Sequence, residues 1–209
     1  MSYYPIYLHM HGRRCLVVGG GIVAERKIAT LLEVGARPTV VSPVITDIIA
    51  RWVKDHAIEL IARRYHSSDL AEHEIAFVAT DDGAVNAQVF SDGRRLGVWV
   101  NAADDPAHCD FILPSVLRRG DLTVAVSSGG TSPALSRTIR EELELYFTEE
   151  YELLVELAAQ ARLELQARRV SVPFETWRRA LSGDVRQLLM RGDLARAKAL
   201  LLRELGVEP

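Results

Sequence analysis

The sequence predicts an α/β protein in which a parallel sheet is followed by a second, mainly helical region. Short segments rich in β-branched residues alternate with helical segments from Cys15 to Asn101, and this alternation is typical of a parallel sheet that helices cover on both faces. A run of three glycines joins the first strand to the first helix. The pattern changes after Pro114, and from Pro133 onward nearly every segment is rich in Leu, Ala, Arg and Glu.

The first strand–helix–strand unit is the clearest part of the pattern. Residues 15–19 read Cys-Leu-Val-Val-Gly, a short apolar run that predicts a buried strand. Apolar residues then recur at helical spacing over 22–32, and Gly35 supplies a stop signal after that helix. The run Pro-Thr-Val-Val at 38–41 predicts the second buried strand.

The later elements continue the alternation. We expect helices at 46–55 and 83–93 and extended segments at 59–62, 75–80, 98–101 and 122–127. From residue 133 onward we expect helices with interruptions near 172–173 and 182–183, where Val-Pro and Ser-Gly pairs occur. This second region has enough leucine to pack on itself or to pair with another subunit.

Composition excludes several classes of protein. The chain has 209 residues, 48% of them hydrophobic, and a net charge of -3, so nothing attracts it as a whole to nucleic acid or to an anionic membrane. The first residues lack the basic start and apolar core of a secretion signal, and no run of about 20 apolar residues is present to cross a bilayer. Cys15 and Cys109 lie far apart and are expected to be reduced thiols. We therefore expect a cytoplasmic enzyme or binding protein.

The glycine run predicts a dinucleotide site in a Rossmann-type fold. Residues 19–24 read Gly-Gly-Gly-Ile-Val-Ala and satisfy G-x-G-x-x-A between a strand and a helix. In that motif Gly19 permits the tight turn, Gly21 lets a pyrophosphate approach the backbone, and Ala24 allows close packing of helix on strand. The second strand ends in Val-Ser-Pro-Val at 41–44, without the acidic residue usual for NAD and without an arginine for a 2′-phosphate. NAD is therefore favoured over NADP.

A second cluster of polar groups follows the strand at 98–101. Three carboxylates (Asp104, Asp105 and Asp110), together with His108 and Cys109, stand between two apolar runs. Such a cluster could ligate a metal, move protons, or form a solvated turn around Asp-Asp-Pro. Asp81 and Asp82, which follow the strand expected at 75–80, are ambiguous in the same way, because either can border a cofactor or cap the next helix.

A third segment has the character of an anion site. Residues 127–133 read Ser-Ser-Gly-Gly-Thr-Ser-Pro, and Thr131 or Ser132 is expected to cap the helix that follows. Arg137 and Arg140 project from the next turns of that helix. The segment can simply cap itself, or it can receive a ligand that bears carboxylates.

Taken together, these residues resemble the siroheme synthase dehydrogenase family, which comprises precorrin-2 dehydrogenases and the N-terminal half of fused methyltransferase enzymes. The resemblance covers about residues 5–145, and no methyltransferase half is recognisable. It is carried by Pro5-Ile6, Cys15-Leu16-Val17-Val18-Gly19-Gly20-Gly21, Val23-Ala24-Glu25-Arg26-Lys27, Ala79-Thr80-Asp81-Asp82, Val100-Asn101, Phe111-Ile112-Leu113-Pro114-Ser115 and Val124-Ala125-Val126-Ser127-Ser128-Gly129-Gly130-Thr131-Ser132-Pro133.

The resemblance implies both an activity and a set of site residues. The implied activity is NAD-dependent dehydrogenation of precorrin-2, a tetrapyrrole with eight carboxylates, to sirohydrochlorin. Many family members also insert ferrous iron, which would be a substrate and not a bound cofactor. The implied catalytic acid/base is Asp104. Pairing with Asp105, or partial burial, would raise the pKa of Asp104. We expect no protein-bound metal centre. The implied cofactor contacts are Gly19, Gly21, Ile22, Val23, Ser42, Pro43, Val44, Thr80 and Asp81, and the implied substrate contacts are Asn101, Ser128, Gly129, Thr131 and Arg137.

The resemblance also implies a domain plan and an oligomeric state. We expect an NAD-binding Rossmann domain at 1–113, a dimerisation and tetrapyrrole-binding region at 114–148, and a C-terminal helical domain at 149–209. The expected assembly is a homodimer that binds neither nucleic acid nor membrane. The alternative is a non-catalytic sensor or carrier of nucleotide or tetrapyrrole, which would bind these ligands without turnover.

Overall fold

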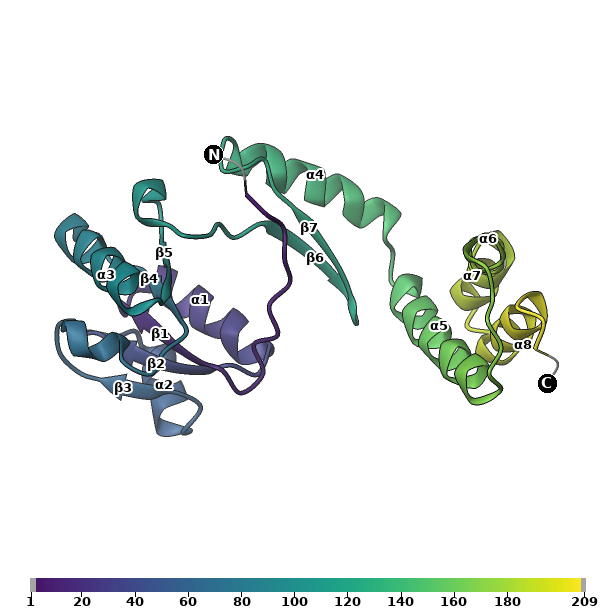
Figure 1. Ribbon diagram of the computed structural model, residues 1–209, viewed down its shortest axis with the longest axis horizontal. Coiled ribbons are helices and arrows are strands. Elements are labelled where there is room, and N and C mark those ends of the chain that lie inside the picture. Colours follow the sequence, from purple (N-terminus) through teal and green to yellow (C-terminus); the bar gives the residue numbers. More distant parts are fainter. Residues whose placement is uncertain (1–2, 208–209) are drawn as a thin grey trace. The chain divides into compact units, whose positions relative to one another are not determined.

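A computed structural model describes residues 3–207. The chain divides into two compact units, residues 1–113 and residues 114–209. The first unit is drawn in purple, blue and dark teal, and the second in green and yellow (Figure 1). The expected three-part division with its assigned roles stays a prediction.

The first unit is built on a five-stranded, wholly parallel sheet in the order β3-β2-β1-β4-β5. Its strands are β1 (Arg14–Val18), β2 (Arg37–Val41), β3 (Glu59–Ile61), β4 (Ile75–Val78) and β5 (Trp99–Ala102). The chain runs outward from β1 to β3 and then crosses to β4 on the other side of β1. This reversal is the topological switch point of a Rossmann-type sheet, where ligands bind beyond the carboxyl ends of the strands. The predicted fold class is confirmed.

Helices cover both faces of this sheet (Figure 1). On one face, α1 (Ile22–Glu33) and α2 (Asp47–Lys54) contribute Ile28 and Ile49 to a core with Val17, Val40 and other strand residues. On the other face, α3 (Gly83–Leu96) contributes Val89 to a core with residues such as Leu16. Cys15 lies fully buried in the first core, where burial raises the pKa of its thiol to about 12, so it acts there as a small apolar side chain.

The helix α3 continues beyond its expected end at Gly93. A Cβ at Gly93 would lie 2.4 Å from Val100 Cγ2 and 2.8 Å from the carbonyl oxygen of Val98, so this glycine allows the helix to pack closely on β5. The helix ends instead at Gly97, whose φ of 74° is in the left-handed region that glycine adopts readily. The sequence shows two glycines, and only packing distinguishes the one that ends the helix.

The second unit begins with an antiparallel hairpin of β6 (Ser115–Arg119) and β7 (Leu122–Val126). We predicted β7 but missed β6. In β6 only Leu117 is buried, and Arg118 and Arg119 interrupt the apolar run, so the strand lacks the sequence signature that β7 has. Next along the chain, α4 (Pro133–Tyr146) packs on both strands of the hairpin.

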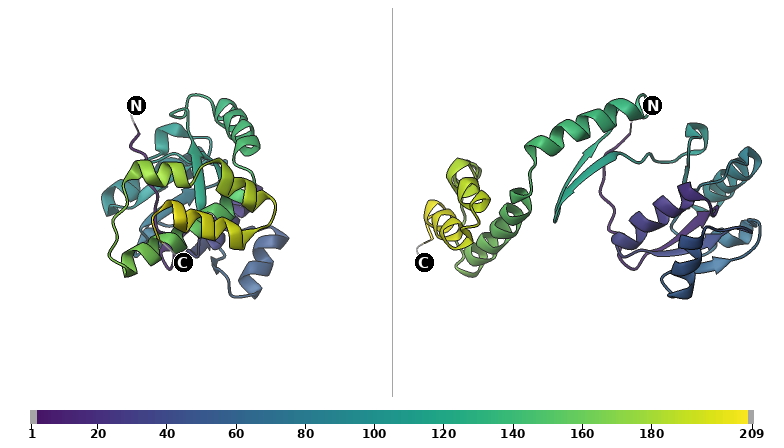
Figure 2. Two further views of the ribbon diagram at one scale, coloured as in Figure 1. Left: turned by 90° about the vertical axis from the view of Figure 1, so that its right-hand side faces the viewer. Right: turned by 180° about the vertical axis from the view of Figure 1, so that it is seen from behind.

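The C-terminal helices form a small bundle (Figure 2). They are α5 (Glu150–Ala167), α6 (Phe174–Ala180), α7 (Gly183–Met190) and α8 (Leu194–Glu204). The expected interruptions near 172–173 and 182–183 are confirmed. Buried Glu150 at the start of α5 pairs with Arg186 of α7 at 3.0 Å, and Arg186 also stacks 4.4 Å from the ring centre of Tyr151. Among the described residues, no helix is both long and apolar enough to cross a membrane.

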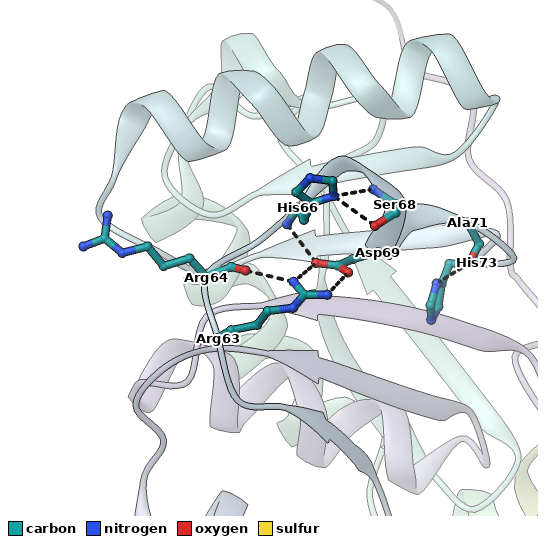
Figure 3. A network of polar contacts seen from close by, with 7 residues as sticks. All are labelled: Arg63, Arg64, His66, Ser68, Asp69, Ala71 and His73. Atoms are coloured by element: carbon teal, nitrogen blue, oxygen red, sulfur yellow. Dashed lines mark hydrogen bonds and ion pairs between the residues drawn. The ribbon is translucent and has the colours of Figure 1, made fainter.

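A buried carboxylate fixes the chain after β3 (Figure 3). Asp69 accepts two hydrogen bonds from the Arg63 guanidinium, at 2.7 and 2.6 Å, and one from the backbone N–H of His66 at 2.8 Å. Burial alone would raise the pKa of Asp69, but the hydrogen bonds from Arg63 and His66 outweigh it and hold the pKa below its usual value. The carboxylate therefore contributes stability only while it is ionised.

Replacing Asp69 with Asn should lower the free energy of unfolding by about 2 kcal/mol at pH 7, because charge-assisted hydrogen bonds at a buried site are lost. The folded-state pKa lies below the unfolded value, so this contribution is fully present above about pH 4 and is lost as the pH falls further. Urea unfolding of D69N and wild type across this range should show the difference shrinking in acid. The exposed Asp55→Asn serves as the control, and an equal effect there would contradict the prediction.

Candidate active site

The glycine turn between β1 and α1 is enclosed by the ends of the two neighbouring strands. Gly19 donates its N–H to the carbonyl oxygen of Val41 at 3.0 Å, and its φ is +119°. A Cβ at Gly19 would lie 2.2 Å from the carbonyl oxygen of Ala79, and one at Gly20 would lie 2.1 Å from that of Val44. The first two glycines are therefore required by close approach to the segments that follow β4 and β2.

The third glycine fits a bound pyrophosphate. Gly21 is the N-cap of α1, no side chain caps the free N–H groups of the first turn, and a Cβ at Gly21 would meet no atom within 4 Å. Uncapped amides and the helix dipole form an anion site at such a terminus. The apolar side chains of Ile22 and Val44 are 70% and 76% exposed, which leaves them free to cover a dinucleotide. The residues present fit the expected cofactor.

Two of the expected cofactor contacts are engaged within the protein. Ser42 is buried, and its hydroxyl donates to the carbonyl oxygen of Val44 at 2.6 Å. The hydroxyl proton is therefore engaged within the turn and is not available to a ribose. Thr80 Oγ1 accepts the N–H of Asp82 at 3.1 Å. Asp82 caps α3 by accepting from the N–H groups of Ala84 and Val85. Of the aspartate pair, Asp82 is thus the helix cap and Asp81 is exposed.

Asp104 stands in a tight turn just beyond the carboxyl end of β5. Its φ is +58°, a left-handed conformation that Asp and Asn adopt more readily than other non-glycine residues, and its side chain is exposed. We expected Asp104 to pair with Asp105 or to be partly buried. Instead, Asp105 accepts a hydrogen bond from His108 at 2.7 Å and a longer one from Asn86, and the His108 contact holds the pKa of Asp105 below its usual value.

The chain then turns back along the outer edge of β5. Asp110 donates its N–H to the carbonyl oxygen of Val100 at 2.7 Å, and its carboxylate accepts the N–H of Val100 at 3.0 Å. Cys109 bridges to Asn101 in the antiparallel sense. Burial raises the pKa of the Cys109 thiol, and its sulfur donates to the carbonyl oxygen of Ala102, so this thiol is a packing group. Within residues 3–207, no three His, Cys, Asp or Glu residues are grouped so as to hold a metal ion.

Asn101 is held from three directions. Its Nδ2 donates to the carbonyl oxygen of Phe111 at 2.9 Å and to Cys109 Sγ at 3.6 Å, and its Oδ1 accepts from Lys27 Nζ at 3.3 Å. We did not assign Lys27 to the site. A signal was present, because Lys27 lies three residues after Ala24 and four before Leu31, both buried in α1, and therefore falls on the apolar stripe of that helix.

In the second unit, the segment at 128–132 is organised by the hydroxyl of Ser128. Ser128 Oγ donates to the carbonyl oxygen of Ser132 and accepts the N–H of Ser132, both at 2.9 Å. Of the two residues expected to cap α4, Thr131 and Ser132, it is Ser132 that forms the N-cap. Thr131 is exposed, and Gly129 and Gly130 both have positive φ. This hydroxyl is therefore engaged in shaping the turn.

Arg137 lies exposed on the second turn of α4 and pairs with Glu141 at 2.8 Å. An exposed pair of this kind contributes at most about 1 kcal/mol, so the guanidinium can exchange its partner for the carboxylate of a ligand at little cost. Its role in binding stays a prediction, as do those of Ser128, Gly129 and Thr131.

Comparison with known proteins places the chain in a family. A family model described as NAD(P)-binding matches residues 6–115, more than half of the chain, and one described as the sirohaem biosynthesis protein central region matches residues 119–144. The chain belongs to the siroheme synthase family of NAD(P)-binding proteins. The siroheme synthases of Nitrosococcus oceani and Stutzerimonas stutzeri are 36% and 39% identical to it, over 96% and 100% of the chain.

The chain matches different fractions of its relatives' lengths. The chain spans less than half of these curated siroheme synthases, 43% and 46% of their lengths. In contrast, the solved structure of SirC, a precorrin-2 dehydrogenase, matches 94% of this chain and 99% of its own, with a TM-score of 0.72 and 28% identity. The resemblance found in the sequence is thereby confirmed at the level of the family.

Alanine at two adjacent glycines should separate folding from ligand binding. Gly20→Ala places a methyl group against the backbone at Val44 and should cost about 3 kcal/mol of stability, because a packed turn cannot give way. Gly21→Ala meets no atom and should change stability by no more than about 0.5 kcal/mol, but it should weaken dinucleotide binding about tenfold by obstructing the pyrophosphate.

Urea unfolding and titration of NADH fluorescence measure the two effects separately. Equal losses of stability in the two variants, or undiminished dinucleotide affinity in G21A, would show that the glycine turn does not have these separate roles.

Proposed function

We propose that this chain catalyses the NAD-dependent oxidation of precorrin-2 to sirohydrochlorin. The observation that carries the proposal is the match to SirC, a precorrin-2 dehydrogenase, along nearly the whole of both chains. The match to curated siroheme synthases over less than half of their length supports the same step and leaves their remaining activities outside the proposal.

The reaction removes two electrons and two protons from the macrocycle. NAD, when bound, accepts one hydrogen as a hydride, and the second leaves as a proton. The open Gly21 and the uncapped first turn of α1 bind the pyrophosphate. No charged side chain lies at 41–44 to receive a 2′-phosphate, which favours NAD over NADP.

In this proposal Asp104 is the group that takes the released proton. Its carboxylate is exposed at the carboxyl end of β5, the edge at which ligands of a Rossmann-type sheet are bound. An Asp in the left-handed region is a local departure from the favoured backbone that is common at functional sites. The substrate carries carboxylates, and Ser128, Gly129, Thr131 and Arg137 are the proposed groups for binding them in the second unit.

Asp104→Asn tests this role while keeping a side chain that tolerates the left-handed backbone. The rate of NADH formation from precorrin-2 and NAD should fall about 100-fold or more, the usual contribution of a general acid or base, with NAD affinity unchanged. NADH absorbance during anaerobic turnover measures the rate. Full activity in D104N would reject Asp104 as the base.

The same assay separates an enzyme from a sensor. Wild-type protein that binds NAD and sirohydrochlorin without forming NADH from precorrin-2 would reject the dehydrogenase and support a carrier. Iron insertion into sirohydrochlorin, with ferrous iron as a substrate, is a second proposed activity, and D104N assayed with Fe²⁺ shows whether the two steps use the same carboxylate.

We also propose that the chain is a homodimer through the second unit. Leu135 and Ile139 are four residues apart on α4, so they lie on the same face of that helix, and both are exposed. Apolar side chains grouped in this way on a surface are typical of a subunit interface.

Ile139→Asp should convert the dimer to a monomer, because a charge at an apolar interface is left without a partner. Sedimentation velocity measures the change, with the exposed Leu163→Asp on α5 as the control. A wild-type monomer, or a dimer that I139D leaves intact, would contradict the proposed interface.

A further inference from the structure

Lys27 occupies an unusual position for a lysine in this chain. The sequence has 25 lysines and arginines, of which only Lys27, Lys54 and Lys198 are lysines. Lys54 is exposed, and Lys198 pairs with Glu164 at 3.0 Å. Lys27 is half-buried, and its ammonium lies 5.7 Å from the centre of the Phe77 ring while donating to Asn101 Oδ1. It thus reaches from α1 across β4 to the end of β5.

This ammonium has no counter-ion in the part of the chain that the structure describes. Its hydrogen-bond partner, Asn101, is neutral, and no carboxylate of residues 3–207 forms an ion pair with it within 4.0 Å. Burial lowers the pKa of Lys27, Cys109 and Asp104 act in the opposite direction, and Arg26 lowers the pKa further. One hydrogen bond uses one of the three N–H donors of an ammonium, so two remain.

A partly desolvated cation without a paired anion lowers the stability of the folded protein. Holding Asn101 in place does not explain the charge, because a neutral donor would satisfy Oδ1 equally well. The cost is explained if an anion arrives to complete the pair, since a charge-assisted hydrogen bond in such surroundings is strong.

We propose that the Lys27 ammonium binds a carboxylate of the substrate beside Asn101. This inference rests on the proposed function and deepens it by adding a group on α1 to the substrate site. The other anion available to this site is the pyrophosphate of the dinucleotide. Lys27 lies five residues beyond Ile22, the first residue of α1, and is directed at β5, whereas a pyrophosphate binds at the first turn of its helix. A substrate carboxylate is therefore the better match.

Selective acylation of lysine tests this contact without turnover. Wild-type protein is treated with limiting N-hydroxysuccinimidyl acetate, alone, with sirohydrochlorin or with NAD, and the modified lysines are quantified by mass spectrometry. We expect sirohydrochlorin to slow acylation of Lys27 at least fivefold while Lys54 and Lys198 react unchanged. Equal protection of all three lysines, no protection, or protection by NAD alone would overturn the proposal.

Substitution provides an independent test. Lys27→Met should raise the KM for precorrin-2 about tenfold, leave the KM for NAD unchanged and not lower the unfolding midpoint, while Lys27→Arg, which keeps the charge, should recover most of the loss. Lys54→Met is the matched control. A merely structural lysine would instead lower stability and change both KM values together, and that result, or an unchanged KM for precorrin-2, would reject the inference.

The two tests fail in different ways. If wild type forms no NADH from precorrin-2, the proposed function is rejected, while sirohydrochlorin protection still decides whether Lys27 is an anion site. If wild type is active but Lys27 is neither protected nor needed for the KM, only the inference is lost. Should K27M not fold, acylation of the wild type decides alone.

Discussion

The close approach of three backbone segments at the glycine turn is the constraint on which the rest of the first unit depends. Gly19 and Gly20 leave no room for a Cβ against Ala79 and Val44, so the turn after β1 locks the ends of β4 and β2 together. Thr46, which caps α2, donates its N–H to the carbonyl oxygen of Gly20 and its hydroxyl to Glu25 of α1. One turn therefore fixes two helices and three strands, and it leaves only Gly21 facing open space.

The groups at the carboxyl end of β5 are arranged by a different principle. Few of them are free: Asn101 is bonded on all sides, Cys109 is a packing group, and Asp105 is committed to His108. Two charged groups remain available for a ligand, the carboxylate of Asp104 and the ammonium of Lys27. A framework whose other polar groups are already partnered, and which carries a small number of available charges, is well suited to a substrate that is itself charged, because little reorganisation is needed on binding.

The sequence was sufficient for the parallel sheet because buried parallel strands read as short apolar runs, and 15–19, 38–41 and 75–80 are such runs. It was insufficient for β6, whose only buried side chain is Leu117, and for the end of α3, where two glycines have different roles. At the site, motif spacing predicted the glycine turn, and the family resemblance pointed to Asp104. It did not reveal that the hydroxyls of Ser42 and Ser128 are engaged internally, since hydroxyl direction is decided by tertiary contacts. Lys27 was overlooked although helical spacing placed it on a buried stripe.

The return of the chain along β5 has a consequence for the solubility of the protein. β5 is the last strand on its side of the sheet, and an unprotected edge strand is a template for pairing with other chains. The backbone and carboxylate of Asp110 bond both the carbonyl and the N–H of Val100, and thereby occupy the positions that an incoming strand would need. The loop that carries Asp104 thus continues directly into the segment around Asp110 that shields the edge of the sheet. Substitutions in this loop are therefore constrained by the need to avoid self-association as well as by the proposed role of Asp104.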